Sequence, residues 1–497
     1  MPKPKSFLKE AKSKKKSAQQ QAPRTADEFL AVGVEQEEAG EKWRAGDAAK
    51  SLRFFMRAIA TYNEGLQAHP TAFDLAYNKA RVQYEITQHP RLAAQLPTPL
   101  SEALSVALQS HREAVVLEQD NADALFNTAQ VLTSLAEIVT DTKRPVEEDL
   151  NQAAKFLQEA IELFQRCLVL QELKYTEMQE QIRQIESGEM GQMEQVKEPE
   201  QMQEGPGVES KESEQEQWAA VVQPVTKDTL VDTAIAQLDA LSTLCNLLAF
   251  DPGVGLSWVE EYSTELLEKK VSTLVEGSNR QYEANLSRAR FNAALNEVLY
   301  RSGRTDVEAY HGAVVSSFKD LDISTDPEGL CAKADALISF NSATAEQPPY
   351  DPEALKKSLE LRWQALSTAI DVLTKASKLP DAENLPKIHL ARGDTEMSRW
   401  RLGFAPWEHS MAQQYGATLL RNAQTYYRGA AALGRRDGGA DEERDGTCKE
   451  AIAAAIEGQK EKLAQLKGSA PKELLQVAED MVEEGWVSGP DMEELLS

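Results

Sequence analysis

The sequence predicts an all-α protein built from stacked pairs of helices. Apolar residues recur every three to four positions in run after run, which is the period of a helix with one buried face. Short polar turns separate these runs. No run alternates with a period of two for long enough to indicate a strand. Tightly joined helix pairs each leave an apolar face uncovered, so they must stack on neighbouring pairs.

Composition restricts the class of protein further. The 497 residues are 41% hydrophobic and 27% charged, and no stretch of about eighteen apolar residues occurs, so we expect no membrane span and no secretory signal. The four cysteines lie far apart without a CxxC motif or a neighbouring histidine pair. This pattern predicts no disulfide framework and no metal site, and a reducing location in the cytoplasm or nucleus. Cys167 is expected to be a small core residue.

Charge is the strongest compositional signal. The chain carries 80 acidic and 54 basic residues, for a net charge of −26. An acidic protein repels nucleic acid and attracts basic partners, so we expect a protein partner of basic character and no direct nucleic-acid binding. The alternative is that the acidic surface only keeps the protein soluble.

Residues 1–25 differ from the rest because they are basic and low in complexity, which predicts a disordered tail. The KSKKK cluster that begins at Lys12 matches short motifs read by import receptors. Basic tails also occur without that role, so nuclear entry stays an open alternative.

The block 26–172 contains the clearest helix pairs. One helix ends near Leu117, a polar turn follows, and the next helix begins at Ala122, with Asn121 expected as its N-cap. Several second helices carry a small, an aromatic and a small residue at a spacing of four then three, on one helical stripe. These trios are Ser51, Phe55, Ala58; Ala160, Phe164, Cys167; and Ala423, Tyr427, Ala430.

The first helix of each pair is expected to present a small residue to the second. The candidates are Ala39, Ala80, Ala129, Ala289 and Ala391. Together with the trios, they resemble the tetratricopeptide repeat family. The resemblance implies a superhelix whose concave face, lined by the first helices, binds a partner. An unrelated bundle of alanine-rich helices is the alternative.

The repeats are irregular. The distance from the small residue to the end of the trio is 19 residues between Ala39 and Ala58 but 38 between Ala129 and Cys167. Insertions at 90–100 and 140–149 account for the excess. We therefore expect a degenerate array in which the number of true repeats is not fixed by the sequence.

Four further segments complete the expected organisation. Residues 173–217 form an acidic, disordered linker that is either inert or shields a basic client, and 218–434 form a second helical block. Residues 435–469 are expected to be an exposed loop, Gly434 to Gly446, followed by a long helix. Residues 470–497 form an acidic amphipathic segment that either caps the array or docks on a partner. If it docks, Trp486 is its expected anchor.

The resemblance also permits a test for one familiar partner, the acidic tail of Hsp70 or Hsp90. That tail is held by Lys, Asn and Arg at fixed places in three first helices. Here Gln36, Gly40, Asp123 and Asn127 stand at four of those places, and only Asn78 matches. Asp123 has the wrong sign for a carboxylate clamp. The candidate partner-binding residues are Asn78, Arg81, Asp123, Asn127, Arg290, Arg392 and Trp486.

No catalytic motif is visible. The six histidines lack the i, i+4 spacing of a zinc helix, and neither a phosphate-binding loop nor a nucleophile elbow occurs. We therefore expect a non-enzymatic protein without cofactor that acts as an assembly chaperone or carrier for a basic client such as a ribosomal protein. The alternative is a scaffold subunit of a complex that handles RNA or chromatin. A role as Hsp70 or Hsp90 co-chaperone is the weakest alternative.

Overall fold

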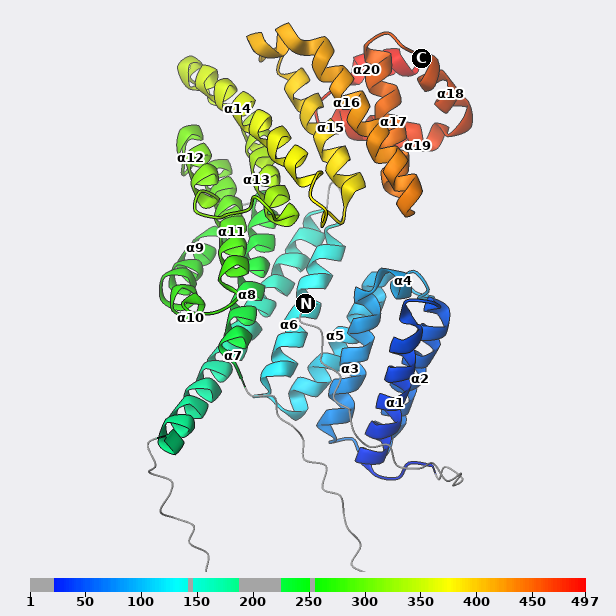
Figure 1. Ribbon diagram of the computed structural model, residues 1–497, viewed down its shortest axis with the longest axis vertical. Helices are drawn as coiled ribbons and strands as arrows, with labels where there is room; N and C mark the ends of the chain where they lie inside the picture. The colour runs from blue at the N-terminus through cyan, green and yellow to red at the C-terminus, as the bar shows by residue number, and fades with distance from the viewer. Residues whose placement is uncertain (1–21, 142–145, 187–224, 251–254) are drawn as a thin grey trace, which may run out of the picture. The chain divides into compact units, whose positions relative to one another are not determined.

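The computed structural model describes residues 22–141, 146–186, 225–250 and 255–497 (Figure 1). Within these ranges it contains twenty α-helices, one short π-helix and no strand, so the predicted all-α class is confirmed. The chain divides into two compact units, Met1–Asp141 (unit 1) and Thr142–Ser497 (unit 2). Of the expected basic tail 1–25 and the expected disordered linker 173–217, residues 1–21 and 187–217 lie outside the described residues. Residues 173–186 are the last part of helix α7 (Glu147–Glu186), so the start of the linker was placed too early.

Unit 1 is a run of helices in which sequence neighbours pack together. Helix α1 packs on α2, α2 on α3, α3 on α5 and α5 on α6, while α1, α3 and α6 also contact one another in order and share one face. The helices are α1 (Ala26–Arg44), α2 (Ala48–Ala68), α3 (Phe73–Gln88), α4 (Pro90–Ala93), α5 (Leu100–Leu117) and α6 (Ala122–Val139).

Polar side chains fix where these helices begin. The Thr25 hydroxyl accepts a hydrogen bond from the Glu28 amide, and the Glu28 carboxylate accepts one from the Thr25 amide, which is a complete capping box. Asn121 accepts from the Ala124 amide at 3.1 Å, so the predicted N-cap of α6 is confirmed. Each cap satisfies an amide that the first turn of a helix leaves without an internal partner.

Unit 2 continues the same neighbour-to-neighbour packing, from α7 on α8 and α8 on α11 to α13 on α14, α15 on α16 and α16 on α17. Such packing is typical of repeat architectures. The helices are α7 (Glu147–Glu186), α8 (Lys227–Leu248), α9 (Gly255–Glu265), the π-helix η2 (Leu266–Val271), α10 (Ser272–Val275), α11 (Gln281–Arg301), α12 (Val307–Ser317), α13 (Pro327–Glu346), α14 (Pro352–Ala376), α15 (Leu385–Arg401), α16 (Ser410–Asp437), α17 (Ala440–Ile456), α18 (Glu461–Ser469), α19 (Pro471–Glu483) and α20 (Gly489–Leu496).

The predicted trios all lie in the core. Their nine side chains, including the free thiol of Cys167, are at most 1% exposed. A small, an aromatic and a small residue at this spacing form one buried stripe, as the helical period requires. The expectation that Cys167 is a core residue is therefore confirmed.

The small residues of the first helices differ from the prediction at two of five positions. Ala80, Ala129 and Ala289 are buried, but Ala39 and Ala391 are only partly buried. In α1 the close approach is made instead by Gly33, where an added Cβ would overlap the Tyr62 ring, and by Gly40, which faces the Phe55 ring. In α15 it is made by Gly393, where an added Cβ would overlap the Tyr427 ring. A large aromatic side chain needs glycine opposite it, so the alanines were the wrong choice.

The division of the chain also differs from the expected blocks. The expected helical block 26–172 is cut at Asp141, and the trio that ends at Cys167 lies on α7, which packs on α8. The proposed repeat from Ala129 to Cys167 is therefore wrong, because its two helices belong to different units. The predicted loop from Gly434 to Gly446 is also wrong. Helices α16 and α17 occupy it except at Gly438 and Gly439, the former in the left-handed conformation that favours glycine.

The C-terminal segment 470–497 belongs to the core of unit 2. One apolar cluster joins Met397 of α15, Tyr427 of α16 and Ile452 of α17 to Met481 of α19 and Trp486. Helices α19 and α20 both pack on α17. This arrangement supports the interpretation of the segment as a cap, because its apolar face covers the end of the array instead of facing solvent.

Candidate functional site

Four of the seven predicted partner-binding residues lie together on the face shared by α1, α3 and α6, called here the unit 1 face. Asn78 and Arg81 belong to α3, and Asp123 and Asn127 to α6. Asn127 donates a hydrogen bond to the Tyr77 hydroxyl at 2.9 Å, and Arg81 Nε approaches Asn78 Oδ1 at 3.4 Å. The first contact links α6 to α3, the second lies within α3, and Asp123 stays exposed.

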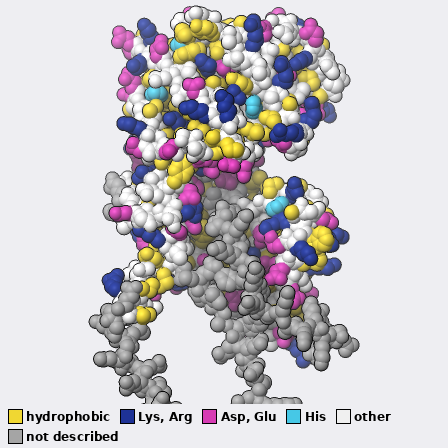
Figure 2. Space-filling model, in the orientation of Figure 1, with side chains coloured by type: hydrophobic (Ala, Val, Ile, Leu, Met, Phe, Trp, Pro, Cys, Tyr) yellow, Lys and Arg dark blue, Asp and Glu magenta, His cyan; other side chains and the backbone are white. Residues whose placement is uncertain are grey.

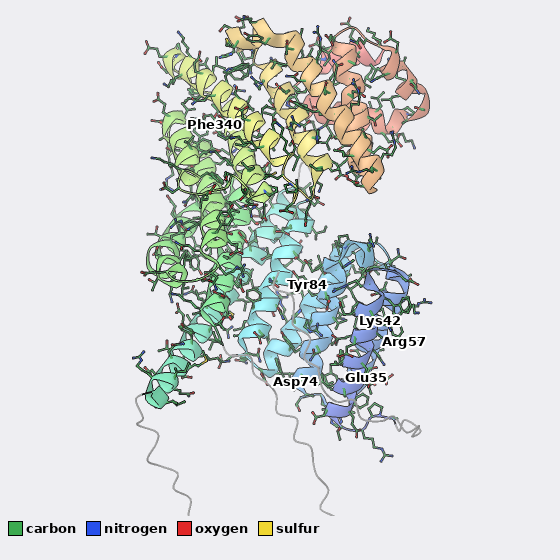
Figure 3. The ribbon with its side chains drawn as sticks, in the orientation of Figure 1. Glu35, Lys42, Arg57, Asp74, Tyr84 and Phe340 are labelled. Atoms are coloured by element: carbon green, nitrogen blue, oxygen red, sulfur yellow. The ribbon has the colours of Figure 1, made fainter. Side chains whose placement is uncertain are left out.

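Tyr84 fixes the spacing of the same two helices. It lies on α3, as Figure 3 shows, with its hydroxyl 3.0 Å from the Ser134 hydroxyl of α6. The hydroxyl also donates to the Gln130 carbonyl at 3.4 Å. The unit 1 face is therefore held by direct contacts between its helices.

Charges on the unit 1 face neutralise one another. Arg81 pairs with Glu37 of α1 and, at 3.2 Å, with Glu85 of its own helix. Arg44 pairs with Glu85 at 2.9 Å and with Glu41. Burial, followed by a hydrogen bond with Glu85, raises the pKa of Glu41 to about 7. Because its own carboxylates hold both arginines, this face is poorly suited to clamp the carboxylates of a partner.

Arg290 lies in a different place, in a cavity of about 460 Å³ within unit 2, called here the unit 2 cavity. The cavity is bounded by the neighbouring helices α8, α11 and α13, together with Tyr310 of α12. Its wall consists of Ser242, Asn246, Arg290, Ala293, Ala294, Glu297, Tyr310, Glu328, Cys331, Ala332, Asp335, Ala336 and Ser339.

The unit 2 cavity is acidic, with three carboxylates and one guanidinium in its wall. Arg290 pairs with Glu328 at 2.8 Å, and Glu297 pairs with Arg301 at 2.8 Å. Asp335 makes no hydrogen bond or ion pair with any described residue, although it stays open to solvent. The surrounding wall excludes water from the Asp335 carboxylate, and this loss of hydration raises its pKa to about 6, while the charge of Arg290 opposes the rise. Asp335 is thus the carboxylate left for a further cation.

Tyr310 adds an unsatisfied polar group to the same wall. Its side chain is fully buried, and its hydroxyl finds no hydrogen-bond partner in the described part of the chain. The ring stacks on Tyr300 with centroids 5.4 Å apart and meets Phe340, labelled in Figure 3, edge-on at 5.1 Å. Burial, reinforced by Glu297, raises the pKa of the hydroxyl far above its usual range, so the group stays a neutral donor and acceptor.

The remaining two predicted residues are not on an open surface. Arg392 is 9% exposed, and its guanidinium lies 3.9 Å from the centroid of the Tyr426 ring. Trp486 is 7% exposed and donates a hydrogen bond to the Ser398 hydroxyl at 3.0 Å. Both side chains pack unit 2 internally, so the structure offers no support for them as partner contacts, and that assignment stays a prediction.

The sequence reasoning missed Glu328 and Asp335, and a signal for them existed. These two residues and Cys331 follow one another at helical spacing along one stripe of α13, which begins at Asp326-Pro327. This stripe did not stand out in the sequence as a candidate site, because acidic residues occur throughout the chain. Tyr310 carried no signal, since only the packing around it shows that its hydroxyl lacks a partner.

Metal sites and membrane spans are the two remaining kinds of feature. Among the described residues, no group of three or more His, Cys, Asp or Glu side chains is arranged to hold a metal ion. In the same part of the chain no helix is both long and apolar enough to cross a membrane.

The fold and these surfaces define the class: an all-α protein with repeat-like helix pairs. No family model matches the chain. The chain is similar to a UPF0656 protein of Schizosaccharomyces pombe, with 26% identity over 425 residues that span 83% of this chain and 85% of that protein. It is also similar to an uncharacterized protein of Saccharomyces cerevisiae, with 27% identity over 195 residues that span 34% and 35% of the two chains.

A comparison with solved structures finds a circular tandem repeat protein with a novel repeat topology and enhanced subunit contact surfaces. The similarity covers 93% of this chain and 99% of that one, with a TM-score of 0.29 and 14% identity. The all-α class follows from the helices and their packing alone.

Proposed function

We propose that this chain is a non-catalytic, protein-binding repeat protein that carries or helps to assemble a basic client, such as a ribosomal protein. The observation that supports it is the unit 2 cavity, in which carboxylates outnumber cations and Asp335 has no ion-pair partner among the described residues. In a chain with a net charge of −26, such a cavity attracts a basic segment and gives it a place to bind.

The distribution of charge favours a local site over a large acidic surface. Figure 2 shows acidic and basic side chains interspersed on the visible face of the described residues. On the unit 1 face the arginines are paired with their own carboxylates. The unit 2 cavity is therefore the place where a carboxylate without an ion-pair partner among the described residues is best placed to bind a basic partner.

The repeat type belongs to the same proposal. We assign the repeats to the tetratricopeptide type because three buried trios share the small–aromatic–small spacing and because α1, α3 and α6 share one face. Glycines replace the small alanines in two of the first helices, and the units are interrupted, so the repeats are degenerate. The proposal includes a location in the cytoplasm or nucleus and assigns no catalytic step, cofactor, membrane or nucleic acid.

A scaffold role in a larger complex is the second candidate, and a groove in unit 1 favours it. The groove has a volume of about 610 Å³ and lies between α2, α3 and α5. Leu66, Ala76, Leu117 and the 72% exposed Val116 contribute apolar surface to it. Exposed apolar surface of this kind is typical of protein interfaces.

The two candidates differ in how their complexes respond to salt. The full-length tagged chain is isolated from cells at about 0.1 M and about 1 M salt, which shortens the Debye length from about 10 Å to about 3 Å. Quantitative mass spectrometry then identifies the bound proteins. A carrier retains one dominant basic protein at low salt and loses most of it at high salt. The absence of a basic protein, or its unchanged retention at high salt, contradicts the carrier proposal, and a salt-resistant set of several subunits supports the scaffold.

A further inference from the structure

We infer that the unit 2 cavity is a binding site for one basic side chain, lysine or arginine, of an extended client segment. The inference rests on the proposed function, since it assumes a basic client, and it assigns the contact to particular residues. It is carried by the carboxylate of Asp335, the buried hydroxyl of Tyr310 and the alanine-rich wall between α11 and α13.

The ion pairs already present determine the sign of the ligand. Arg290 is held by Glu328 at 2.8 Å, so it offers no free charge to an anion. Asp335 is the carboxylate of the wall without an ion-pair partner among the described residues, and Arg290 acts on it only at longer range. A side-chain cation placed beside Asp335 gains a charge-assisted hydrogen bond, which is shorter and stronger than a bond between neutral groups.

Tyr310 points to a ligand independently of the charges. A buried hydroxyl without a hydrogen-bond partner is rare in folded proteins. Tyr310 lines the same cavity as Asp335, and its hydroxyl can accept a hydrogen bond from an ammonium or guanidinium group. A basic side chain therefore satisfies two groups of the wall, one charged and one neutral.

The rest of the wall fits the aliphatic stem of such a side chain. Ala293 and Ala294 of α11 and Ala332 and Ala336 of α13 present small apolar groups. Lysine and arginine bury their methylene stems on apolar surface while the charged head reaches polar groups. The volume of about 460 Å³ lies within the range of about 300–1,000 Å³ that small-ligand pockets occupy.

The test uses the full-length chain and a fluorescein-labelled nonapeptide with three lysines separated by glycines. A second peptide carries norleucine in place of each lysine, which keeps the stem and removes the charge. Binding is followed by fluorescence anisotropy at low salt for the unaltered protein and for Asp335→Asn, Tyr310→Phe and Asp371→Asn. Asp371 is an exposed carboxylate on α14, so its variant removes the same charge outside the cavity wall.

We expect the lysine peptide to bind and the norleucine peptide not to bind. Asp335→Asn weakens binding about tenfold and Tyr310→Phe about threefold, because they remove the ionic and the neutral acceptor respectively. Asp371→Asn changes affinity by less than about twofold. In hydrogen exchange, the lysine peptide slows the amides of α11 and α13 and leaves those of α15 to α17 unchanged. Circular dichroism establishes that each variant is folded.

Equal losses in Asp335→Asn and Asp371→Asn overturn the inference, because they show attraction by net charge alone. Binding of the norleucine peptide, no binding by the unaltered chain, or protection confined to helices other than α8, α11, α12 and α13 also overturns it. The proposed function is judged separately. If the Asp335→Asn chain and the unaltered chain capture equal amounts of a basic client from cells, the binding site is contradicted but the carrier function is not. The absence of any basic client contradicts the carrier function itself.

Discussion

The same packing device occurs near both ends of the chain, in α1 to α3 and in α15 to α17. In each, a glycine of one helix makes room for a fully buried tyrosine of the next, and the tyrosine hydroxyl donates to a carboxylate of the first helix. That carboxylate lies one turn after the glycine in the first case and directly after it in the second. A cation from the third helix pairs with that carboxylate. We call these arrangements the first tyrosine lock (Gly33, Tyr62, Glu37, Arg81) and the second tyrosine lock (Gly393, Tyr427, Asp394, Lys449).

The two locks use different residues for the same contacts. In the first, the Tyr62 hydroxyl donates to Glu37 at 2.5 Å, and Arg81 pairs with Glu37. In the second, the Tyr427 hydroxyl donates to Asp394 at 2.8 Å, and Lys449 pairs with Asp394 at 2.8 Å. A ring opposite glycine joins two helices, and the ion pair then joins the third.

Their cations show what distinguishes the two locks. Arg81 is shared with Glu85 on the unit 1 face, and about a third of its side chain is exposed. Lys449 is 12% exposed and lies 5.1 Å from the centroid of the Trp486 ring, in the segment that caps the array. The first lock therefore borders a surface, whereas the second is closed by the C-terminal segment.

The largest expected effect comes from removing the closure of the second lock. Trp486→Ala should lower the free energy of unfolding of unit 2 by about 4 kcal/mol, because a buried aromatic ring leaves a cavity. Urea unfolding followed by circular dichroism measures it. Leu475→Ala on α19 is the control, since that side chain is 52% exposed and should change stability by less than about 0.5 kcal/mol. Equal stability of both variants would mean that Trp486 serves a partner instead of the core.

The glycines of both locks come next. Gly33→Ala and Gly393→Ala place a Cβ inside the ring positions of Tyr62 and Tyr427, and each should cost about 3 kcal/mol because the packed ring has no room to move. Hydrogen exchange by mass spectrometry assigns each loss to its unit. Gly312→Ala in α12 meets no atom within 4 Å and should be neutral or stabilising by up to about 1 kcal/mol. Unchanged exchange in α1 to α3 for Gly33→Ala would contradict the first lock.

These glycines also show how far the sequence alone can predict the molecule. The helical class, the trios and the Asn121 cap follow from local patterns of three to seven residues, and those expectations are confirmed. The pattern indicated Ala39 and Ala391 because the sequence shows where small residues lie, but it does not show which aromatic ring each of them faces. Which small residue lies opposite a ring depends on the register between helices, and register is a property of the packed pair.

The prediction of the candidate site was also limited, because the sequence does not show how the helices pack on one another. Asn78, Arg81, Asp123 and Asn127 lie on one face because they occupy corresponding stripes of related helices. Trp486 was expected as an anchor only if the C-terminal segment docks on a partner, and its burial could not be predicted because the sequence does not show which helices cover it. The unit 2 cavity escaped prediction because its wall combines side chains of α8, α11, α12 and α13, and only the packing of these helices determines which side chains face one another.

Removing the cation should destabilise the first tyrosine lock more than the second. Arg81→Met should cost about 2 kcal/mol and Lys449→Met about 1 kcal/mol, both below the cost of breaking a fully buried pair because water reaches these residues. The difference arises because the Glu37 side chain is 11% exposed and the Asp394 side chain 28%, so the carboxylate left behind is more buried in the first lock. Thermal unfolding of both variants measures it. A greater loss for Lys449→Met would show that its contact with Trp486 outweighs the ion pair.

The smallest expected effect is a pH dependence of the stability, caused by Glu41 near the first tyrosine lock. Burial and Glu85 raise the pKa of Glu41 to about 7 in the folded chain, against an ordinary value of 4.5. The folded state then binds a proton that the unfolded state has released, so stability falls as pH rises from about 4.5 to about 7. Because 40% of the Glu41 side chain is exposed, solvent screening keeps the effect below about 1 kcal/mol.

Glu41→Gln cannot ionise, so its stability relative to the unaltered chain should increase over that interval, measured by urea unfolding at pH 5 and at pH 8. A constant difference between the two proteins would mean that Glu41 is ionised throughout, and that Arg44 and Arg81 outweigh its burial beside Glu85.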